Sequence, residues 1–333
     1  MRASSEPSRA HPQPVSHSPL CWTASIDVVV VNYETPHLLD ECLQSVNAHQ
    51  SDVVGSVIVV DNSITSTSIE LVRRQHPDVV VIRPLANIGY GAAANQGCRA
   101  GQGDYALVLN ADTQLQAGAL EALVDELIRH PEAAVAGPQL VDPHGRDQPS
   151  CANFPTPGRM LLHETGLWKL LRTRRLRARV QPFFNPAAPA RVPWVLGAAV
   201  AVRRRCFDAV GGFDPSYFMY FEEVDLCRRL SAAGADTRFV PNARVIHVGG
   251  ASTALARAPM QRDMFRSLAR YTRRHHNAAN LVALRVAVTV VALIRLVYDF
   301  GSYLASRRGR GQRADANGWF AIMLDAARGW PDD

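Results

Sequence analysis

Asn110 and Asp112 are the clearest candidates for chemistry in this 333-residue chain. They follow the apolar run at 105–109 and are separated by one alanine. An amide oxygen and a carboxylate at this spacing are hard ligands suited to Mg²⁺ or Mn²⁺, and phosphates can complete the shell of such an ion. Asp112 is equally suited to cap a helix that begins near 117, so the residues alone leave both interpretations open.

A second acidic cluster, formed by Glu222, Glu223 and Asp225, lies in the stretch FMYFEEVDLCRRL at 218–230. Carboxylates in the first turn of a helix are stabilised by the helix dipole, which is a purely structural explanation for the cluster. The neighbouring aromatic side chains favour a different role, because partial desolvation raises the pKa of a carboxylate toward the range of a general base. Both roles stay open.

The elements that must position these residues alternate between strands and helices, a pattern that favours a parallel α/β sheet. Apolar runs predict strands at 26–31, 56–60, 79–82 and 105–110, and helical patterns lie between them at about 37–47, 66–75, 91–101 and 117–130. A strand at 194–202, helices near 203–210 and 222–233, and a short strand at 237–240 complete the expected compact part.

Polar residues stand where three of the predicted strands end, which is where an open parallel sheet binds its ligands. Each group is compatible with an ordinary turn, because Asn and Asp bond readily to the nearby backbone. Their repetition at one edge of the sheet favours a binding site; they are Asn32, Tyr33 and Glu34 after the first strand, Asp61 after the second, and Asn110 after the fourth.

The glycine-rich stretch ANIGYGAAANQG at 86–97 matches a dinucleotide-binding fingerprint. That fingerprint needs a strand that leads directly into the glycine turn. Here six residues, including Pro84, separate the run at 79–82 from Gly89. This gap argues against a nicotinamide or flavin site, and an oxidoreductase is kept only as an alternative.

Composition indicates a globular protein with a sizeable core, since 47% of the residues are hydrophobic. The six cysteines contain no Cys-x-x-Cys pair, which speaks against a disulfide framework or a zinc site. The formal net charge of +6 comes almost wholly from arginine, because Lys169 is the only lysine. Arginine clusters at 172–179, 203–205 and 307–313 could face phosphate or lipid, or form solvated basic surfaces.

The two ends of the chain have different compositions. Residues 1–24 are rich in Ser, Pro and His without an apolar segment, so we expect a disordered leader rather than a secretory signal. In the apolar stretch at 281–300, Arg285 and Arg295 bracket nine residues. That is well short of the roughly 20 residues that span a bilayer, and we expect no transmembrane helix. This helix and the basic pattern at 262–277 could lie in a bilayer interface or pack back on the domain.

Seven segments, in this order, resemble the inverting glycosyltransferases of family 2, in particular their rhamnosyltransferase-like branch. They span about residues 26–250 and read VVVVNYE, VVDNS, NIGYGAAANQG, LNADT, WVLGAAVAVRR, GGFDPSYFMYFEEVDLCRR and VIHVGG. The resemblance implies a GT-A fold, with a single mixed, mostly parallel sheet flanked by helices. It implies a glycosyltransferase domain at 25–250, with a nucleotide-binding half at about 25–140 and an acceptor half at about 141–250. A C-terminal helical extension at 251–333 would follow.

The resemblance also implies where the donor and a divalent metal bind. Asp61 matches the residue that pairs with the nucleotide base, and Asp112 stands in the Asp-x-Asp metal motif, whose first Asp is replaced by Asn110. We therefore expect Asp112 to be the principal ligand of Mg²⁺ or Mn²⁺, joined by His247 as in some relatives. The residues expected to bind the nucleotide sugar are Asn32, Tyr33, Glu34, Asp61, Asn87, Gly89 and Asn110.

For catalysis, the resemblance implies a single displacement with inversion and no covalent intermediate. Glu223 occupies the position of the general base, where the family usually has Asp, and Glu222 is the alternative. Trp194 and Gly197 match the segment that flanks the acceptor, where a flat ring could stack on a sugar. The two departures at Asn110 and Glu223 also leave open a catalytically silent relative that binds sugar nucleotides without turnover.

The expected partners follow from the same branch of the family. The resemblance implies a nucleotide-sugar donor, with dTDP-rhamnose preferred, and a glycan or lipid-linked glycan acceptor in cell-envelope polysaccharide synthesis. We expect no nucleic-acid partner. We expect a cytoplasmic protein with peripheral contact at the inner face of the cell membrane.

Overall fold

The computed structural model describes residues 24–49, 53–170, 173, 183–249, 257–305 and 310–330. Of the predicted leader at 1–24, all but Ala24 lies outside the described residues. Nearly all of the arginine cluster at 172–179 and part of the one at 307–313 lie outside them as well.

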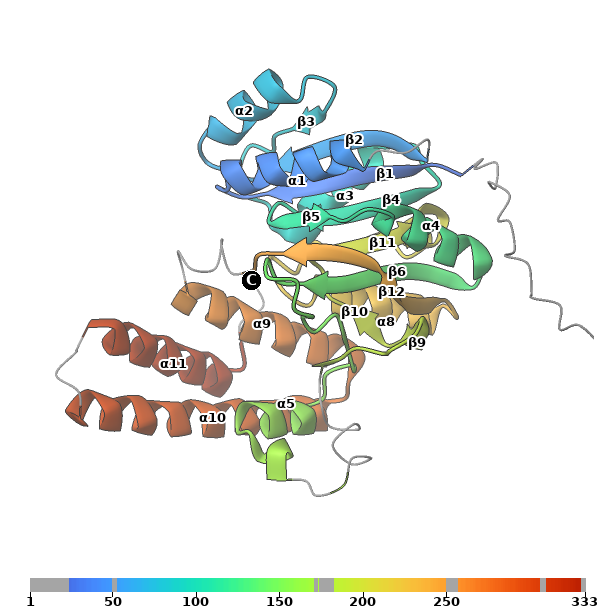
Figure 1. Ribbon diagram of the computed structural model, residues 1–333. Helices are drawn as coiled ribbons and strands as arrows, with labels where there is room; N and C mark the ends of the chain where they lie inside the picture. Colours follow the sequence, from blue (N-terminus) through green and yellow to red (C-terminus); the bar gives the residue numbers. More distant parts are fainter. Residues whose placement is uncertain are drawn as a thin grey trace, which may run out of the picture.

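A nine-stranded mixed sheet forms the centre of the molecule (Figure 1). Its strand order is β3-β2-β1-β4-β11-β6-β12-β5, and β9 also pairs with β12. The strands are β1 (Ile26–Asn32), β2 (Val54–Asp61), β3 (Val80–Ile82), β4 (Tyr105–Asn110), β5 (Thr113–Leu115), β6 (Ala133–Val141), β9 (Ala190–Val192), β11 (Ala199–Arg203) and β12 (Asp236–His247). The first four predicted strands are therefore confirmed, and β1, β2, β3 and β4 pair in parallel.

Helices cover both faces of this sheet, and the side chains of β1 show why. Val28 and Val30 point into the core that contains Leu39 of α1, whereas Val29 and Val31 point into the core on the opposite face. Such alternation is the geometry of a strand buried on both sides. The covering helices are α1 (Pro36–Ala48), α2 (Thr67–Gln75), α3 (Tyr90–Ala100), α4 (Ala119–Arg129), α7 (Arg204–Ala209) and α8 (Glu222–Ala232).

The strand predicted at 194–202 is interrupted in the structure, which corrects the sequence-based expectation. Its first part is β10 (Trp194–Val195), which belongs to a separate three-stranded sheet with β7 (Cys151–Ala152) and β8 (Phe183–Phe184). The chain crosses between the sheets at 196–198, where the Leu196 N–H donates to Ser150 and the Ala198 carbonyl accepts from Asn110. The segment around Gly197 is therefore a connection between sheets at the edge where β4 ends.

The short strand predicted at 237–240 continues to His247. A register shift between Val240 and Arg244 accommodates Pro241, which has no N–H to donate to the ladder with β6. The extension matters for the site, because it pairs His247 with Thr113 of β5 and so brings the end of β12 beside the end of β4.

Three long helices follow the sheet and lie below it in Figure 1, together with α5 (Pro157–Glu164) and the short 3₁₀ helix η1 (Leu167–Leu170). They are α9 (Arg257–His275), α10 (Ala278–Ala305) and α11 (Arg310–Arg328). Their shared core contains Phe265, Val288 and Ile322 from the three helices. The apolar run around Arg285 and Arg295 is one unbroken helix.

The length of α10 corrects an expectation drawn from sequence. Within the described residues, one segment is long enough and apolar enough to cross a membrane, judged by length and composition alone. This segment is Ala278–Tyr298, and its mean hydropathy is 2.2. The expectation that Arg285 and Arg295 leave an apolar segment too short to span a bilayer is therefore wrong, because the apolar helix continues past both arginines. Only 28% of the most apolar part of this segment is buried in the protein.

Candidate active site

Asn32 and Asp61 form a buried polar pair where β1 and β2 end. The two residues are register partners in adjacent parallel strands, and Nδ2 of Asn32 donates to Oδ1 of Asp61 at 2.8 Å. The Ser63 hydroxyl donates to the same carboxylate oxygen at 2.5 Å. Oδ2 of Asp61 is buried without a partner. An unsatisfied buried carboxylate oxygen is costly, so this atom is suited to accept a hydrogen bond from a ligand.

Glu34 shapes the loop beside this pair. It adopts a positive φ of 52°, and its Oε1 accepts hydrogen bonds from the Ile64 and Thr65 N–H groups at 2.6 and 3.1 Å. The Thr65 hydroxyl donates to Oε2 at 2.7 Å and is the main reason that the pKa of Glu34 lies below its usual value. Glu34 therefore orders the loop after β2, while Tyr33 next to it is half-buried.

Gly89 lies where the glycine-rich stretch touches the segment before α8. It has a φ of 84°, and a Cβ at this position would lie 2.4 Å from the Phe218 carbonyl oxygen. The Asn87 side chain accepts from the Gly89 N–H at 3.0 Å, and Asn62 donates to the Gly89 carbonyl at 3.1 Å. A glycine is thus required at position 89 so that its backbone can approach the backbone of Phe218 closely. Helix α3 begins eight residues after β3 ends at Ile82. The tight strand-to-helix turn of a dinucleotide site is absent here.

Asp112 and His247 face one another where β4 and β12 end. Nε2 of Gln148 donates to the His247 carbonyl at 2.9 Å, so Oε1 of Gln148 faces Nδ1 of His247 at 3.0 Å. Nδ1 therefore bears a proton, and Nε2 lies 3.7 Å from Oδ1 of Asp112. That carboxylate oxygen is buried and has no hydrogen-bond partner.

This donor set fits a divalent cation. A carboxylate oxygen is a ligand type that suits Mg²⁺ or Mn²⁺, and the neutral imidazole nitrogen of histidine is a common metal ligand. Within the described residues, no group of three or more His, Cys, Asp and Glu side chains could hold a metal on its own. A metal held by Asp112 and His247 would need oxygen atoms from a ligand to complete its shell.

Glu222 and Glu223 open α8 after a strained turn. Tyr220 and Phe221 have positive φ values of 66° and 69°, which side-chain-bearing residues adopt at a cost, often at functional sites. Burial raises the pKa of both carboxyls, and the Glu223 charge raises that of Glu222 further. Glu223 accepts a hydrogen bond from the Gly197 N–H, and Oε2 of each glutamate is buried without a partner.

Tyr90 lies near Asp112 and the glutamate pair. Its hydroxyl donates to the Gly197 carbonyl at 2.8 Å. Burial raises the pKa of Tyr90 most, and the charges of Glu222, Glu223 and Asp112 raise it further. Tyr90 therefore lies near carboxylates from two parts of the chain, the segment after β4 and the start of α8.

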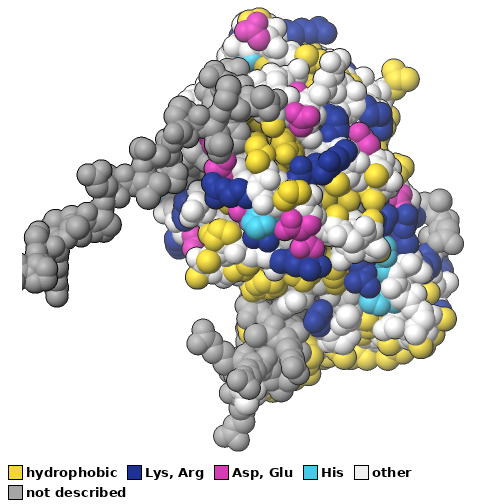
Figure 2. Space-filling model, turned by 90° about the vertical axis from the view of Figure 1, so that its right-hand side faces the viewer, with side chains coloured by type: hydrophobic (Ala, Val, Ile, Leu, Met, Phe, Trp, Pro, Cys, Tyr) yellow, Lys and Arg dark blue, Asp and Glu magenta, His cyan; other side chains and the backbone are white. Residues whose placement is uncertain are grey.

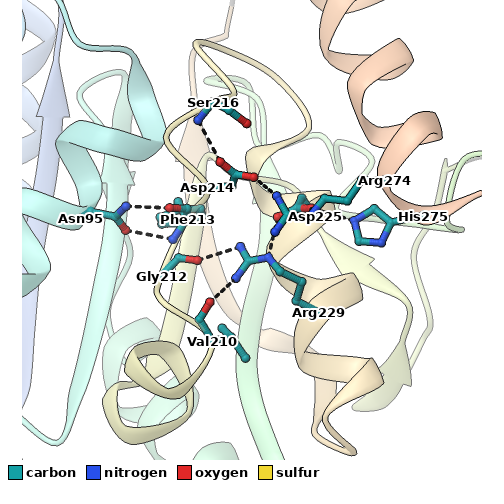
Figure 3. Close-up of polar contacts among 10 residues, drawn as sticks. All are labelled: Asn95, Val210, Gly212, Phe213, Asp214, Ser216, Asp225, Arg229, Arg274 and His275. Carbon is teal, nitrogen blue, oxygen red and sulfur yellow. Dashed lines mark hydrogen bonds and ion pairs between the residues drawn. The ribbon is translucent and has the colours of Figure 1, made fainter. Parts of the chain in front are cut away.

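Asp225 belongs to the scaffold below this site. Its side chain is fully buried, and it accepts from Nε of Arg229 at 2.6 Å and from Nε2 of His275 at 2.7 Å. Arg229 also donates to the carbonyls of Val210 and Gly212, so it ties α8 to the turn before it (Figure 3). The third carboxylate of the acidic cluster is therefore fully paired and is not available as a base.

Trp194 also lies in the scaffold. Only 8% of it is exposed, its indole N–H donates to the Asn153 carbonyl at 3.0 Å, and its ring packs edge-on against Phe183. This placement leaves the ring in the core and gives no support to stacking on an acceptor sugar. Gly197, in contrast, directly contacts the Glu223 side chain, where an added Cβ would lie 3.4 Å from Oε1.

A protein-family model described as "Glycosyltransferase like family 2" matches residues 24–266. The chain belongs to glycosyltransferase family 2. It is 34% identical over 246 residues to N-acetylglucosaminyl-diphospho-decaprenol L-rhamnosyltransferase of Mycobacterium tuberculosis, which covers 69% of this chain and 78% of that protein. It is also 48% identical to rhamnosyltransferase WbbL of Escherichia coli over 56 residues, 17% of this chain and 21% of that one.

Solved structures confirm the predicted GT-A fold of this family 2 glycosyltransferase. The mannosyltransferase PcManGT of Pyrobaculum calidifontis, solved with GDP-Man and Mn²⁺, aligns with a TM-score of 0.55 at 17% identity, over 93% of this chain and 88% of that chain. GalNAc-T7, solved with UDP, GalNAc and Mn²⁺, aligns with a TM-score of 0.53 at 18% identity, over 74% of this chain and 47% of that chain. Membership of this family rules out the alternative of a dinucleotide-dependent oxidoreductase.

Three residues that organise the candidate site were not singled out from the sequence. Gln148 lies in an irregular segment with no pattern to mark it, yet its side chain contacts both the carbonyl and Nδ1 of His247. Asn62 follows Asp61 directly at the end of β2 and donates to the Gly89 carbonyl. Tyr90 lies inside the glycine-rich stretch, next to Gly89. Its position as the aromatic residue of that stretch was the available signal.

Proposed function

We propose that this family 2 glycosyltransferase transfers rhamnose from dTDP-rhamnose to a lipid-linked glycan acceptor, with inversion, in cell-envelope polysaccharide synthesis. One observation supports it most: Asp112, Glu222 and Glu223 each have a buried side-chain oxygen without a hydrogen-bond partner. Such atoms are costly unless a ligand or a reaction uses them. The choice of sugar and acceptor is supported by the name of the M. tuberculosis relative, an N-acetylglucosaminyl-diphospho-decaprenol L-rhamnosyltransferase.

In this proposal the donor nucleotide lies over the ends of β1 and β2. Oδ2 of Asp61 accepts a hydrogen bond from an N–H of the base, since it is the buried acceptor without a partner. Asn32 holds Asp61 in place through its 2.8 Å hydrogen bond, and Glu34 keeps the neighbouring loop ordered. Asn87 holds the Gly89 turn that lines the pocket, and Asn110 lies beside the pyrophosphate.

Asp112 and His247 are proposed to hold a divalent metal ion together with the donor pyrophosphate. When bound, the ion supplies electrostatic stabilisation of the negative charge that develops on the leaving nucleoside diphosphate. Gln148 orients the His247 ring by accepting a hydrogen bond from Nδ1–H, which leaves Nε2 as the nitrogen that faces the ion. Mn²⁺ in the two structural neighbours is consistent with this role.

Glu223 is proposed to accept the proton of the attacking acceptor hydroxyl. It is half-buried, whereas Glu222 is only 5% exposed, so an acceptor can reach Glu223 more easily. The raised pKa strengthens Glu223 as a base once it is ionised. Attack opposite the leaving group inverts the anomeric centre, so no residue has to form a covalent bond to the sugar.

The experiment is a donor screen that measures released nucleoside diphosphate in the presence of a polyprenyl-diphosphate-linked acceptor and Mn²⁺. Turnover with dTDP-rhamnose, lost on Glu223→Gln but kept on Glu222→Gln, supports the proposal. Preference for another nucleotide sugar would replace the donor, and binding without turnover for every donor would favour the catalytically silent relative. We further propose that the reaction takes place at the inner face of the cell membrane, where a nucleotide sugar and a lipid-linked acceptor meet.

A further inference from the structure

Helix α10 has an apolar face that no described part of the chain covers. Its side chains are between 41% and 73% exposed, and they recur at intervals of three and four residues, so they share one side of the helix. We call this side the outer face of α10; it consists of Val282, Val286, Val290, Leu293, Ile294, Val297 and Tyr298. A contiguous exposed apolar face of this kind marks an interaction surface.

The two arginines of α10 point away from the outer face. Nε and a terminal nitrogen of Arg285 donate to the carbonyls of Ala326 and Ala327 at the end of α11, at 2.9 and 2.6 Å. The Arg295 guanidinium lies over the Trp319 ring, 5.8 Å from its centroid. The charges that interrupt the apolar run in the sequence are therefore turned onto α11, and the outer face is free of charge along its length.

The opposite side of α10 is packed in the protein. Leu284, Val288 and Val291 are buried against residues of α9 and α11, among them Phe265 and Trp319. A helix with one side packed against the protein and an exposed apolar side can lie in the plane of a membrane interface, with the apolar side in the lipid. Crossing the bilayer would instead place both arginines and their α11 partners in hydrocarbon, which is costly.

The charge of this region matches an anionic lipid surface. Residues 257–333 contain thirteen arginines and six aspartates, with no glutamate or lysine. Four of these arginines lie at 307–313, just after the outer face ends at Tyr298. Basic residues beside an embedded helix are attracted to anionic headgroups, and an exposed tyrosine suits the boundary between headgroups and acyl chains.

We propose that the outer face of α10 lies in the plane of an anionic lipid bilayer and anchors the enzyme to it. In Figure 1, α10 is far from the sheet and extends past the side on which the strands end. Figure 2 shows hydrophobic side chains along the lower edge of the molecule, at the level of α10 in Figure 1. The docked enzyme would hold its site beside the membrane surface. The link to a lipid-linked acceptor rests on the proposed function, whereas the docking itself does not.

The test compares the full-length wild type with the double variant Val286→Glu/Leu293→Glu, which places two charges on the outer face. Ile128→Glu on α4 is the matched control, because Ile128 is an exposed apolar helix residue away from α10. Flotation is measured with phosphatidylglycerol-containing vesicles and with pure phosphatidylcholine vesicles. We expect the wild type and the control to float with anionic vesicles, and the double variant to bind at least about tenfold more weakly.

Three outcomes would overturn the proposal. Equal flotation of the double variant and the wild type would exclude the outer face as the anchor. Resistance of the bound wild type to alkaline carbonate would indicate a spanning helix in place of an in-plane one. A wild-type dimer that the double variant disrupts, without vesicle binding, would assign the face to a second copy. Turnover with a detergent-solubilised acceptor distinguishes the two proposals. If only the membrane anchor is wrong, the enzyme still turns over this acceptor; if the proposed function is wrong, it does not.

Discussion

Nε2 of His275, at the end of α9, lies 2.7 Å from Oδ1 of Asp225 in α8. Arg274, the preceding residue, pairs with Asp214 in the turn that leads to α8 (Figure 3). On α3, Asn95 exchanges two hydrogen bonds with the backbone of Phe213 in the same turn. The segment that bears Glu222 and Glu223 is therefore held from two sides, and one of them is a helix that follows the sheet domain.

We predict that Asp225→Ala destabilises the protein by about 3 to 5 kcal/mol, because it leaves the partly buried Arg229 and His275 without their partner. Urea denaturation measures this change. His275→Ala removes one contact and should cost about 1 to 2 kcal/mol. His37→Ala, at an exposed position of α1, is the control. Asp225→Ala at wild-type stability and full activity would exclude the scaffold role and reopen Asp225 as a base.

Activity is predicted to require a divalent metal held through Asp112. Asp112→Ala should lower kcat by at least about a hundredfold, as expected for loss of an electrostatic element of the transition state. His247→Gln should raise the Mn²⁺ concentration needed for half-maximal rate, and Gln148→Leu should do so more weakly. Assays with EDTA and back-titration with Mn²⁺ measure these effects. Chelator-resistant turnover, with Asp112→Ala close to wild type, would refute the metal site.

Glu223→Gln is predicted to lower kcat by roughly 10² to 10⁴ while donor binding changes little. Glu222→Gln should have a much smaller effect. Burial raises the pKa of Glu223, and the base must be ionised, so kcat/KM should rise with pH through an apparent pKa above the ordinary glutamate value. In the Glu223→Gln variant, the residual kcat/KM should no longer show this rise with pH. The opposite ranking of the two variants would move the base to Glu222.

Glu222→Gln is predicted to stabilise the fold at neutral pH. Burial and the Glu223 charge raise the pKa of Glu222 in the folded state, so the folded protein binds this proton more tightly than the unfolded chain. The free energy of unfolding of the wild type therefore falls as pH rises above the unfolded-state value. The variant does not lose this stability, because glutamine does not ionise. The Tm of the variant should therefore exceed that of the wild type by a margin that grows between pH 4 and 7 and vanishes at lower pH. A Tm difference independent of pH would contradict the raised pKa.

Gly89→Ala is predicted to damage both stability and turnover. The residue has a positive φ, and an added Cβ would meet the Phe218 carbonyl at 2.4 Å, so the segment before α8 must move. Gly118→Ala is the matched control, because Gly118 also has a positive φ but nothing within 4 Å of the added Cβ. The control should lose only about 1 kcal/mol, and Gly89→Ala clearly more, with a lower kcat. Equal losses would show that the contact with Phe218 is unimportant.

The sequence by itself determined the elements whose patterns are local. Four apolar runs predicted β1 to β4, because a short apolar run bounded by polar residues is typical of a strand in a parallel sheet, and the helices between them have the helical period. The motifs in their order indicated the family, and the polar residues at strand ends indicated the edge where the site lies. Asp61 and Asp112 were named as candidates from strand ends, and Glu223 from the acidic cluster and the family resemblance; their roles stay predictions.

Contacts between distant segments were decided only by the tertiary structure. Asp225 and Glu223 are two residues apart in one acidic cluster, yet Asp225 is paired with Arg229 and His275 while Glu223 keeps a free oxygen. Gln148 became a partner of His247 because the segment after β6 packs against the end of β12, 99 residues along the chain. The arginines of α10 likewise contact α11 because the two helices pack together in the folded protein. A side chain's partners depend on which segments fold together, and no local spacing records them.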